Sequence, residues 1–163
     1  SMDKMGRKRI IMDRQDKEPY LIRYYLLFTD RSESFPFNIF IHKFLKGDDD
    51  ELHDHPWGYF TLIISGGYNE VLLNKNGKNT THWRGPGFFQ KVNQSHAHAI
   101  HLDDSEEAEE CWTLFIPFKR EKKWGFWKPK ENNKAADDKE NDTTGVNYEW
   151  IDSNEYLKAK KNR

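Results

Sequence analysis

Two histidines separated by one residue, His53 and His55, carry the strongest chemical signal in the sequence, within "GDDDELHDHPWGYF" (47–60). In an extended strand, residues two apart project from the same face, so the two imidazoles face one side and Asp54 faces the other. Pro56 restricts His55 to extended backbone angles and so preserves this arrangement. Two imidazoles held side by side form half of a metal site, for which Asp54 is a poor ligand candidate.

A second pair, His96 and His98, lies in "GPGFFQKVNQSHAHAIHL" (85–102) and also shares one face. Ile100 continues this face inward, and a strand that points into a barrel would bring one of the two histidines to the first pair. We expect His98 to complete a three-histidine metal site, with His96 as a fourth ligand or as an acid/base group at the rim. The alternative for the first pair is a structural role, with hydrogen bonds to the acidic turn before it.

Four other side chains are candidates for the same site. Tyr59 shares the parity of the first histidine pair, so its hydroxyl could reach the cavity, or it could be a core tyrosine bonded to the backbone. Glu70 is the nearby carboxylate that could act as a ligand, although its direction is not determined by the pattern. Gln90 shares a face with apolar neighbours and is expected to be a polar group in the cavity. His42 is either an outer-shell group or a hydrogen-bonded core histidine.

The elements that must position these groups are short β-strands. Runs rich in β-branched and aromatic residues recur between turn signals, at 7–13, 20–29, 37–45, 59–73, 81–92, 96–102 and 111–119. Gly66-Gly67 predicts a hairpin turn, and Asn76-Gly77 predicts a tight turn. Many short strands at this spacing favour an all-β sandwich or barrel.

The domain limits follow from composition. We expect residues 1–6 to be a disordered N-terminus with a tag remnant at Ser1-Met2, and residues 7–127 to form one β-barrel. Residues 128–147 are almost free of apolar side chains, which predicts a flexible charged linker or loop. Residues 148–163 are expected to form a short C-terminal helix capped by Asp152 or Ser153.

Composition limits the function. The 163 residues suffice for one domain, and a net charge of −1 gives no basic field for nucleic acid. Cys111 is the single cysteine, which excludes an internal disulfide and a cysteine-based zinc cluster, and we expect it to be an inert buried thiol. The absence of a signal-like or membrane-spanning stretch predicts a cytoplasmic protein that contacts no membrane.

The two histidine stretches resemble the paired motifs of the cupin superfamily, which are small jelly-roll barrels with a metal in their mouth. The first cupin motif is a glycine, five residues, His-x-His, three or four residues, a glutamate, six residues and a glycine. The positions that fit this spacing are Gly47, His53, His55 and Gly66 or Gly67. The glutamate position falls on Tyr59 or Phe60, so the family's carboxylate ligand is absent. The second motif aligns Gly87 and His98, but its proline, inner glycine and terminal asparagine fall on Asn93, Ser95 and Leu102.

The resemblance covers about residues 37 to 118. Closer similarity, in "LHDHPW", "LIISGGY", "GPG", "HAH" and "WTLFIPFKREKKWGFW", is to a poorly characterised branch of bacteria and phages. This branch implies a cupin-type jelly-roll barrel with a metal site, but it implies no reaction. The similarity of a three-histidine ligand set to that of the cysteine dioxygenase group implies a mononuclear non-haem iron oxygenase of a small chelating molecule. The metal ligands would be His53, His55 and His98, with Tyr59 orienting the substrate or oxygen, as in cupins similar to the cysteine dioxygenase group. The metal would be Fe²⁺, with Zn²⁺, Ni²⁺ and Mn²⁺ as alternatives.

Two other functions remain open. The barrel could be a non-catalytic binder of a ligand or partner protein, with a structural metal or none, and a closed site that includes His96 would favour structural zinc. A 2-oxoglutarate-dependent oxygenase normally needs His-x-Asp or His-x-Glu, which the sequence lacks unless Glu70 ligates. The expected partners are a small-molecule substrate or ligand, no specific nucleic acid, and a second copy of the chain in a possible homodimer.

Overall fold

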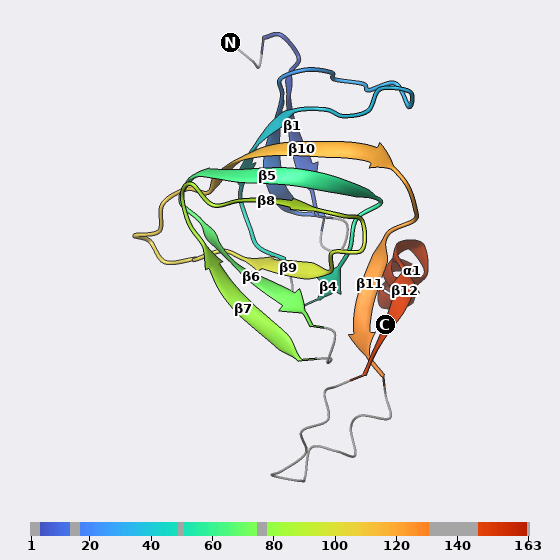
Figure 1. The fold of residues 1–163 in the computed structure, drawn as a ribbon. Helices are drawn as coiled ribbons and strands as arrows, with labels where there is room; N and C mark the ends of the chain where they lie inside the picture. Colours follow the sequence, from blue (N-terminus) through green and yellow to red (C-terminus); the bar gives the residue numbers. More distant parts are fainter. Residues whose placement is uncertain (1–3, 14–16, 49–50, 75–77, 131–146, 163) are drawn as a thin grey trace.

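The described residues form two antiparallel sheets of six strands each, which curl toward one another (Figure 1). The computed structural model describes residues 4–13, 17–48, 51–74, 78–130 and 147–162. Most of the predicted linker, the Asn76-Gly77 turn and the first three residues lie outside this part of the chain. The prediction of an all-β fold with one short C-terminal helix is confirmed.

The first sheet has the order β1-β2-β3-β10-β5-β8. Its strands are β1 (Lys8–Met12), β2 (Pro19–Tyr25), β3 (Phe40–Phe44), β5 (Trp57–Ser65), β8 (Phe89–Val92) and β10 (Trp112–Arg120). The second sheet has the order β12-β11-β4-β9-β6-β7. Its strands are β4 (Leu52–His53), β6 (Tyr68–Leu73), β7 (Asn79–Arg84), β9 (His98–His101), β11 (Gly125–Pro129) and β12 (Tyr148–Asp152).

The prediction of a hairpin at Gly66-Gly67 is wrong. Strand β5 pairs with β8 and β10, whereas β6 pairs with β7 and β9, so the two glycines carry the chain from one sheet to the other. Gly66 has a positive φ of 69°, and a Cβ there would meet the Glu110 carbonyl oxygen at 2.4 Å. The glycine pair therefore marks a tight turn, but one that changes sheets instead of joining paired strands.

The C-terminal segment begins with a strand before its helix. Residues 148–152, expected to be helical, form β12 and pair with β11, and helix α1 (Ser153–Lys161) follows. The Asp152 side chain caps this helix by accepting a hydrogen bond from the Asn154 backbone N–H. Tyr156 of α1 stacks on Phe126 of β11 with ring centroids 4.1 Å apart, which docks the helix beside the second sheet.

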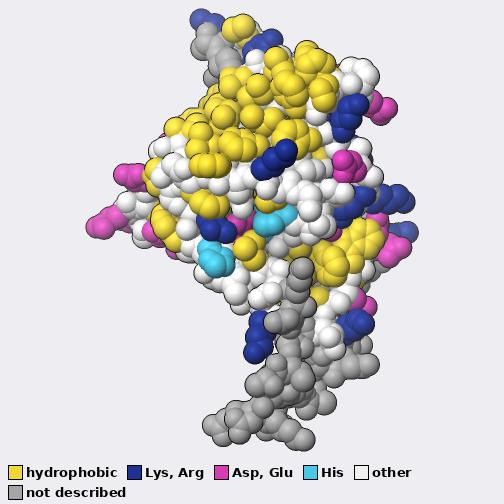
Figure 2. All heavy atoms as spheres, in the orientation of Figure 1, with side chains coloured by type: hydrophobic (Ala, Val, Ile, Leu, Met, Phe, Trp, Pro, Cys, Tyr) yellow, Lys and Arg dark blue, Asp and Glu magenta, His cyan; other side chains and the backbone are white. Residues whose placement is uncertain are grey.

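The apolar side chains divide between a core and one exposed face. Ile63, Tyr68, Ile100 and Cys111 form a buried cluster between the sheets, where burial raises the pKa of the Cys111 thiol to about 11. Figure 2 shows hydrophobic side chains gathered on the outside of the sheet that contains β5, β8 and β10, where Phe89 is 65% exposed. Within the described residues, no helix is long and apolar enough to cross a membrane.

Candidate metal centre

Three histidines converge between the sheets. The ligand atoms of His53, His55 and His98 lie within 4.8 Å of one another. The three ring-centroid distances are 5.1, 5.1 and 5.2 Å, so the imidazoles form a nearly equilateral triangle. The backbone explains this arrangement, because His53 on β4 stands opposite His98 on β9 in the strand register. One triangular face of three imidazole nitrogens can hold a divalent metal and leave further coordination positions open.

The surroundings of His55 and His98 favour neutral imidazoles. Burial, the largest cause, lowers the pKa of His55 well below its ordinary value, and the neighbouring His53 lowers it further. Burial also lowers the pKa of His98, against the opposing effect of its hydrogen bond to Glu70. Nδ1 of His55 is buried and has no hydrogen-bond partner among the described residues. Neutral, incompletely bonded imidazoles fit a metal ligand set, because the metal binds the deprotonated nitrogen.

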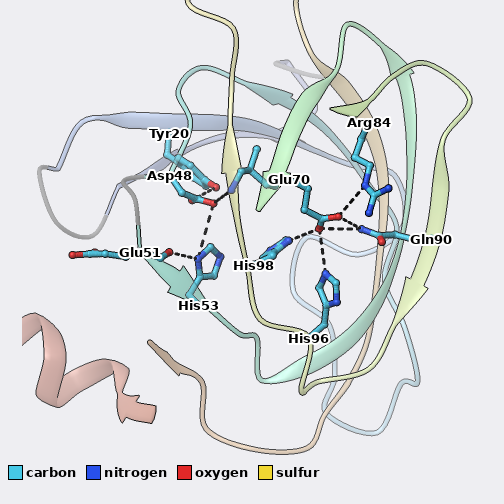
Figure 3. Close-up of polar contacts among 10 residues, drawn as sticks. Tyr20, Asp48, Glu51, His53, Glu70, Arg84, Gln90, His96 and His98 are labelled. Carbon is cyan, nitrogen blue, oxygen red and sulfur yellow. Dashed lines mark hydrogen bonds and ion pairs between the residues drawn. The ribbon is translucent and has the colours of Figure 1, made fainter. Parts of the chain in front are cut away.

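Glu70 supports the centre from behind (Figure 3). Its side chain is 0% exposed, and its Oε2 lies 2.7 Å from His98 Nδ1 and 3.2 Å from His96 Nε2. Arg84 Nε donates to Oε1 at 3.1 Å, and Gln90 Nε2 lies 3.2 Å from both oxygens. A proton on His98 Nδ1 that faces this carboxylate leaves Nε2 free for a metal, which is the usual second-shell arrangement of metal-binding histidines.

This network places three of the predicted residues. Glu70, His96 and Gln90 form one cluster and are not among the residues that line the cavity described below. Glu70, His96 and His98 also form a second group whose ligand atoms lie within 4.8 Å. Both oxygens of Glu70 already accept hydrogen bonds, including one from a guanidinium, so the first group is the better metal site.

Glu70→Gln is expected to weaken metal binding about 10- to 100-fold, because His98 loses the carboxylate that orients its ring. Burial raises the pKa of Glu70, but the hydrogen bonds from His96 and His98 outweigh it and hold the pKa well below 4.5. The carboxylate therefore stabilises the fold above pH 4.5, and this contribution is lost as the pH falls. Glu70→Gln should remove it and flatten the acid side of the curve of stability against pH. Metal titration and thermal unfolding from pH 3 to 7 test both effects, with Glu107→Gln on the surface as the control.

Asp48 is a residue of the site that the sequence interpretation missed, since the run 48–51 reads as a solvated acidic turn. Its Oδ1 accepts from the Tyr20 hydroxyl at 2.8 Å and its Oδ2 from the Ile100 backbone N–H at 2.7 Å. Oδ2 also lies 4.0 Å from His53 Nδ1, which is 3.4 Å from the Glu51 carbonyl oxygen. These acceptors favour a proton on Nδ1 of His53 and leave its Nε2 for the metal.

The residue before Asp48 must be glycine because the backbone passes close to β9 there. A Cβ on Gly47 would meet the Ile100 carbonyl oxygen at 2.8 Å, so the loop can approach β9 only with glycine at this position. The close approach brings the Asp48 backbone N–H within 2.7 Å of the same oxygen. The backbone thus anchors the carboxylate next to the centre.

Asp54 points away from the centre, as its parity predicts. It is 1% exposed and accepts hydrogen bonds from Lys122 Nζ at 2.7 Å and the Gly125 backbone N–H at 2.9 Å. The indole N–H groups of Trp150 and Trp127 also donate to it, at 3.1 and 3.3 Å. This buried carboxylate joins the His-x-His segment to β11 and β12 and so holds the two histidines in place.

A cavity of roughly 570 Å³ opens in front of the triad and falls within the size range of small-molecule sites. His53, His55, His98 and Tyr59 line it. Tyr59 is 2% exposed, its hydroxyl has no hydrogen-bond partner among the described residues, and its ring centroid lies 5.3 Å from that of His55. Burial, and then the charge of Glu70, raise the pKa of Tyr59 well above 10, so its hydroxyl is a neutral donor.

His42 lines another part of the same cavity, where it stacks on Phe115 with ring centroids 5.0 Å apart. Its Nε2 lies 3.0 Å from Arg23 Nε, so this nitrogen accepts the hydrogen bond. Burial, and then the charge of Arg23, lower the pKa of His42 well below its ordinary value. His42 is therefore a neutral core histidine that orients Arg23.

Comparison with known proteins identifies the fold. The sequence matches no family model and no curated protein. The structure is similar to hydroxypropylphosphonic acid epoxidase from S. wedmorenis, with a TM-score of 0.51 and 15% identity over 69% of this chain and 56% of that chain. It is also similar to an Fe(II)-HppE structure with the alternative substrate (S)-1-HPP, with a TM-score of 0.52 and 16% identity over 69% and 57%. An oxalate decarboxylase from Bacillus subtilis gives a TM-score of 0.49 and 14% identity over 69% and 27%.

The chain has a cupin-type jelly-roll fold, as its two histidine motifs predict. It spans a little more than half the length of the epoxidase chains that it matches. At this level of identity the similarity concerns the fold alone. The chemistry must therefore be argued from the residues of the site itself.

Proposed function

We propose that this protein is a mononuclear metal-dependent oxygenase that acts on a small chelating molecule, with Fe²⁺ held by His53, His55 and His98. The observation that carries the proposal is that three imidazoles converge on the wall of a cavity large enough for a small molecule. Fe²⁺ in such a site would supply the coupling of dioxygen reduction to substrate oxidation. The similarity in fold to an Fe(II) enzyme is consistent with this metal.

The charge of the ligand set supports a chelating anion as substrate. In oxygenases with two histidines and one carboxylate, the carboxylate cancels one unit of the metal's charge. The three-histidine ligand group contains no carboxylate, since Glu70 is bonded to His98 and both Asp48 oxygens accept other hydrogen bonds. A chelating substrate with an anionic donor atom would cancel the unit of metal charge that a carboxylate ligand cancels in those oxygenases.

Tyr59 is the residue that we expect to act on the substrate. Its neutral hydroxyl is buried beside the triad and has no other partner among the described residues. It would donate a hydrogen bond to a substrate oxygen and so fix the orientation of that substrate. Trp57 stacks on His55 with ring centroids 5.0 Å apart and covers it from water.

The test is oxygen uptake by the iron-loaded protein, with a panel of small thiols and dicarboxylic acids. We expect at least one member to raise the uptake, and we expect nitric oxide to give the electron paramagnetic resonance signal of a high-spin iron–nitrosyl. Tyr59→Phe should retain iron and lower the turnover about 10- to 100-fold, as the loss of one positioned donor does. Iron that gives no nitrosyl signal would indicate a closed site and contradict the proposal.

A further inference from the structure

Arg23 of β2 is a partly buried cation without an anionic partner. Its Nε donates to His42 Nε2, and its guanidinium carbon lies 4.3 Å from the centroid of the Phe40 ring. Within the described part of the chain, no carboxylate lies within salt-bridge distance of it. Burial lowers the pKa of Arg23, although an arginine stays protonated at neutral pH. A charge in such a place costs stability unless a ligand pairs with it.

A second arginine increases the positive charge. Arg9 of β1 stands opposite Arg23 in the antiparallel register, and like charges in opposite positions destabilise a strand pair. Both guanidinium carbons lie near the Tyr25 ring, at 5.2 Å for Arg9 and 5.9 Å for Arg23. No salt bridge of Arg9 occurs among the described residues either. Arg9 is exposed and does not line the cavity, so it adds positive charge beside Arg23 without being part of the site.

Arg23 faces the cavity that the triad also lines. The wall between them is formed by a row of rings, in which His42 contacts Phe115 at 5.0 Å and Phe115 contacts Tyr59 at 4.9 Å. Tyr59 in turn contacts His55 of the triad. Thr113, opposite His42 in the strand register, adds a buried hydroxyl with no hydrogen-bond partner among the described residues. Arg23 and the triad thus line one cavity, and the rings of His42, Phe115 and Tyr59 form a continuous row between them.

We propose that the cavity binds an elongated molecule whose terminal oxyanion, a carboxylate or phosphonate, pairs with Arg23 while its apolar body lies along Phe115 and Tyr59. The other end of the molecule reaches the triad, and this half of the inference rests on the proposed function. The anion site itself does not depend on a metal. Arg23 would therefore select the substrate by the charge and length of its remote end.

The test uses octanoate, octylphosphonate and the neutral control 1-octanol, with binding measured by calorimetry on metal-free protein. Arg23→Met keeps the aliphatic stem and removes the charge, so it should weaken octanoate binding about tenfold or more and leave 1-octanol unchanged. Arg23→Lys keeps the charge, so its affinity for octanoate should fall between those of the unaltered protein and Arg23→Met. The preferred anion, carboxylate or phosphonate, shows which group the site accepts.

Two controls make the result decisive. Arg120→Met, an exposed cation at the same cavity, should alter octanoate binding less than about twofold, because solvent screens an exposed charge. His53→Ala/His55→Ala should retain octanoate binding. Suberate, with a carboxylate at each end, should bind more tightly than octanoate only when Fe²⁺ is present. If the protein binds no metal, the comparison of octanoate binding with and without Arg23 still tests the anion site.

The proposal is overturned if Arg23→Met binds octanoate as well as the unaltered protein does. It is also overturned if that variant only lowers Tm, as a purely structural arginine would. Loss of octanoate binding in the histidine double variant, with Arg23→Met unaffected, would place the anion at the triad and contradict the inference in the same way.

Discussion

Replacing His98 with alanine is expected to abolish stoichiometric iron binding, with an affinity loss of more than about 100-fold, beyond the loss seen when only a second-shell partner is removed. His98 belongs both to the histidine triad and to the Glu70 network. Its ring lies 5.1 Å from that of His53 and 5.2 Å from that of His55. Its hydrogen bond to Glu70 orients the ring. Anaerobic Fe²⁺ titration with a competing chelator measures the affinity.

Two histidine variants serve as controls for this result. His82→Ala removes an exposed imidazole of β7 that is bonded to Thr80, and it should bind iron as the unaltered protein does. His96→Ala should weaken binding far less than His98→Ala, because His96 is not one of the three ligands and is bonded to Glu70 beside His98. Loss of iron in His96→Ala, with His53→Ala unaffected, would assign the metal to the Glu70 group instead.

Asp54→Ala is expected to destabilise the fold by about 3–5 kcal/mol, the range for breaking a buried ion pair by removing one partner. The carboxylate accepts from Lys122, from the Gly125 backbone and from two indole N–H groups, so its loss leaves several buried donors without a partner. Because Asp54 lies between His53 and His55, the variant should also weaken metal binding. Chemical denaturation and Fe²⁺ titration measure the two effects.

Asp104→Asn, which changes an exposed carboxyl group, should leave the unfolding midpoint unchanged and is the matched control. Asp54→Asn separates charge from shape, since the amide keeps an oxygen for the Gly125 N–H but loses the ion pair to Lys122. The stability of Asp54→Asn should fall between those of Asp54→Ala and the unaltered protein. An Asp54→Ala protein as stable as the unaltered one would show that the carboxylate does not hold β4 against β11.

The placement of the histidines could be predicted because it depends on local rules. Alternation in an extended backbone puts His53 and His55 on one face, and Pro56 favours extended angles at His55, although β4 itself ends at His53. The opposite orientation of Asp54 follows from the same alternation. The all-β class followed from short aromatic and β-branched runs, which is again a property of neighbouring residues.

What escaped prediction depends on contacts between distant segments. Gly66-Gly67 has the sequence of a hairpin turn, but whether the following strand pairs with β5 or crosses to the other sheet is set by tertiary packing. Strand β12 exists because β11 offers it an edge, which no local pattern of residues 148–152 shows. Asp48 looks like any acidic loop residue, and only the approach of β9 turns it into a partner of Ile100.

Glu70 shows the same limit within the site. Its direction depends on Arg84 of the neighbouring strand β7 and on Gln90, which comes from the other sheet. The sequence could name it as the nearby carboxylate, but not show that it supports His98 from behind. Arg23 was likewise not recognisable, because its isolation from carboxylates appears only in the folded chain.

The most direct test of the metal site is elemental analysis of protein purified without a nickel column, compared with the His53→Ala/His55→Ala double variant. We expect about one equivalent of iron per chain after anaerobic reconstitution, as one three-histidine site would hold, and none in the variant. Circular dichroism would show that the variant is folded. No stoichiometric metal in the unaltered protein after reconstitution, or equal metal in both proteins, would contradict the assignment of the centre to His53, His55 and His98.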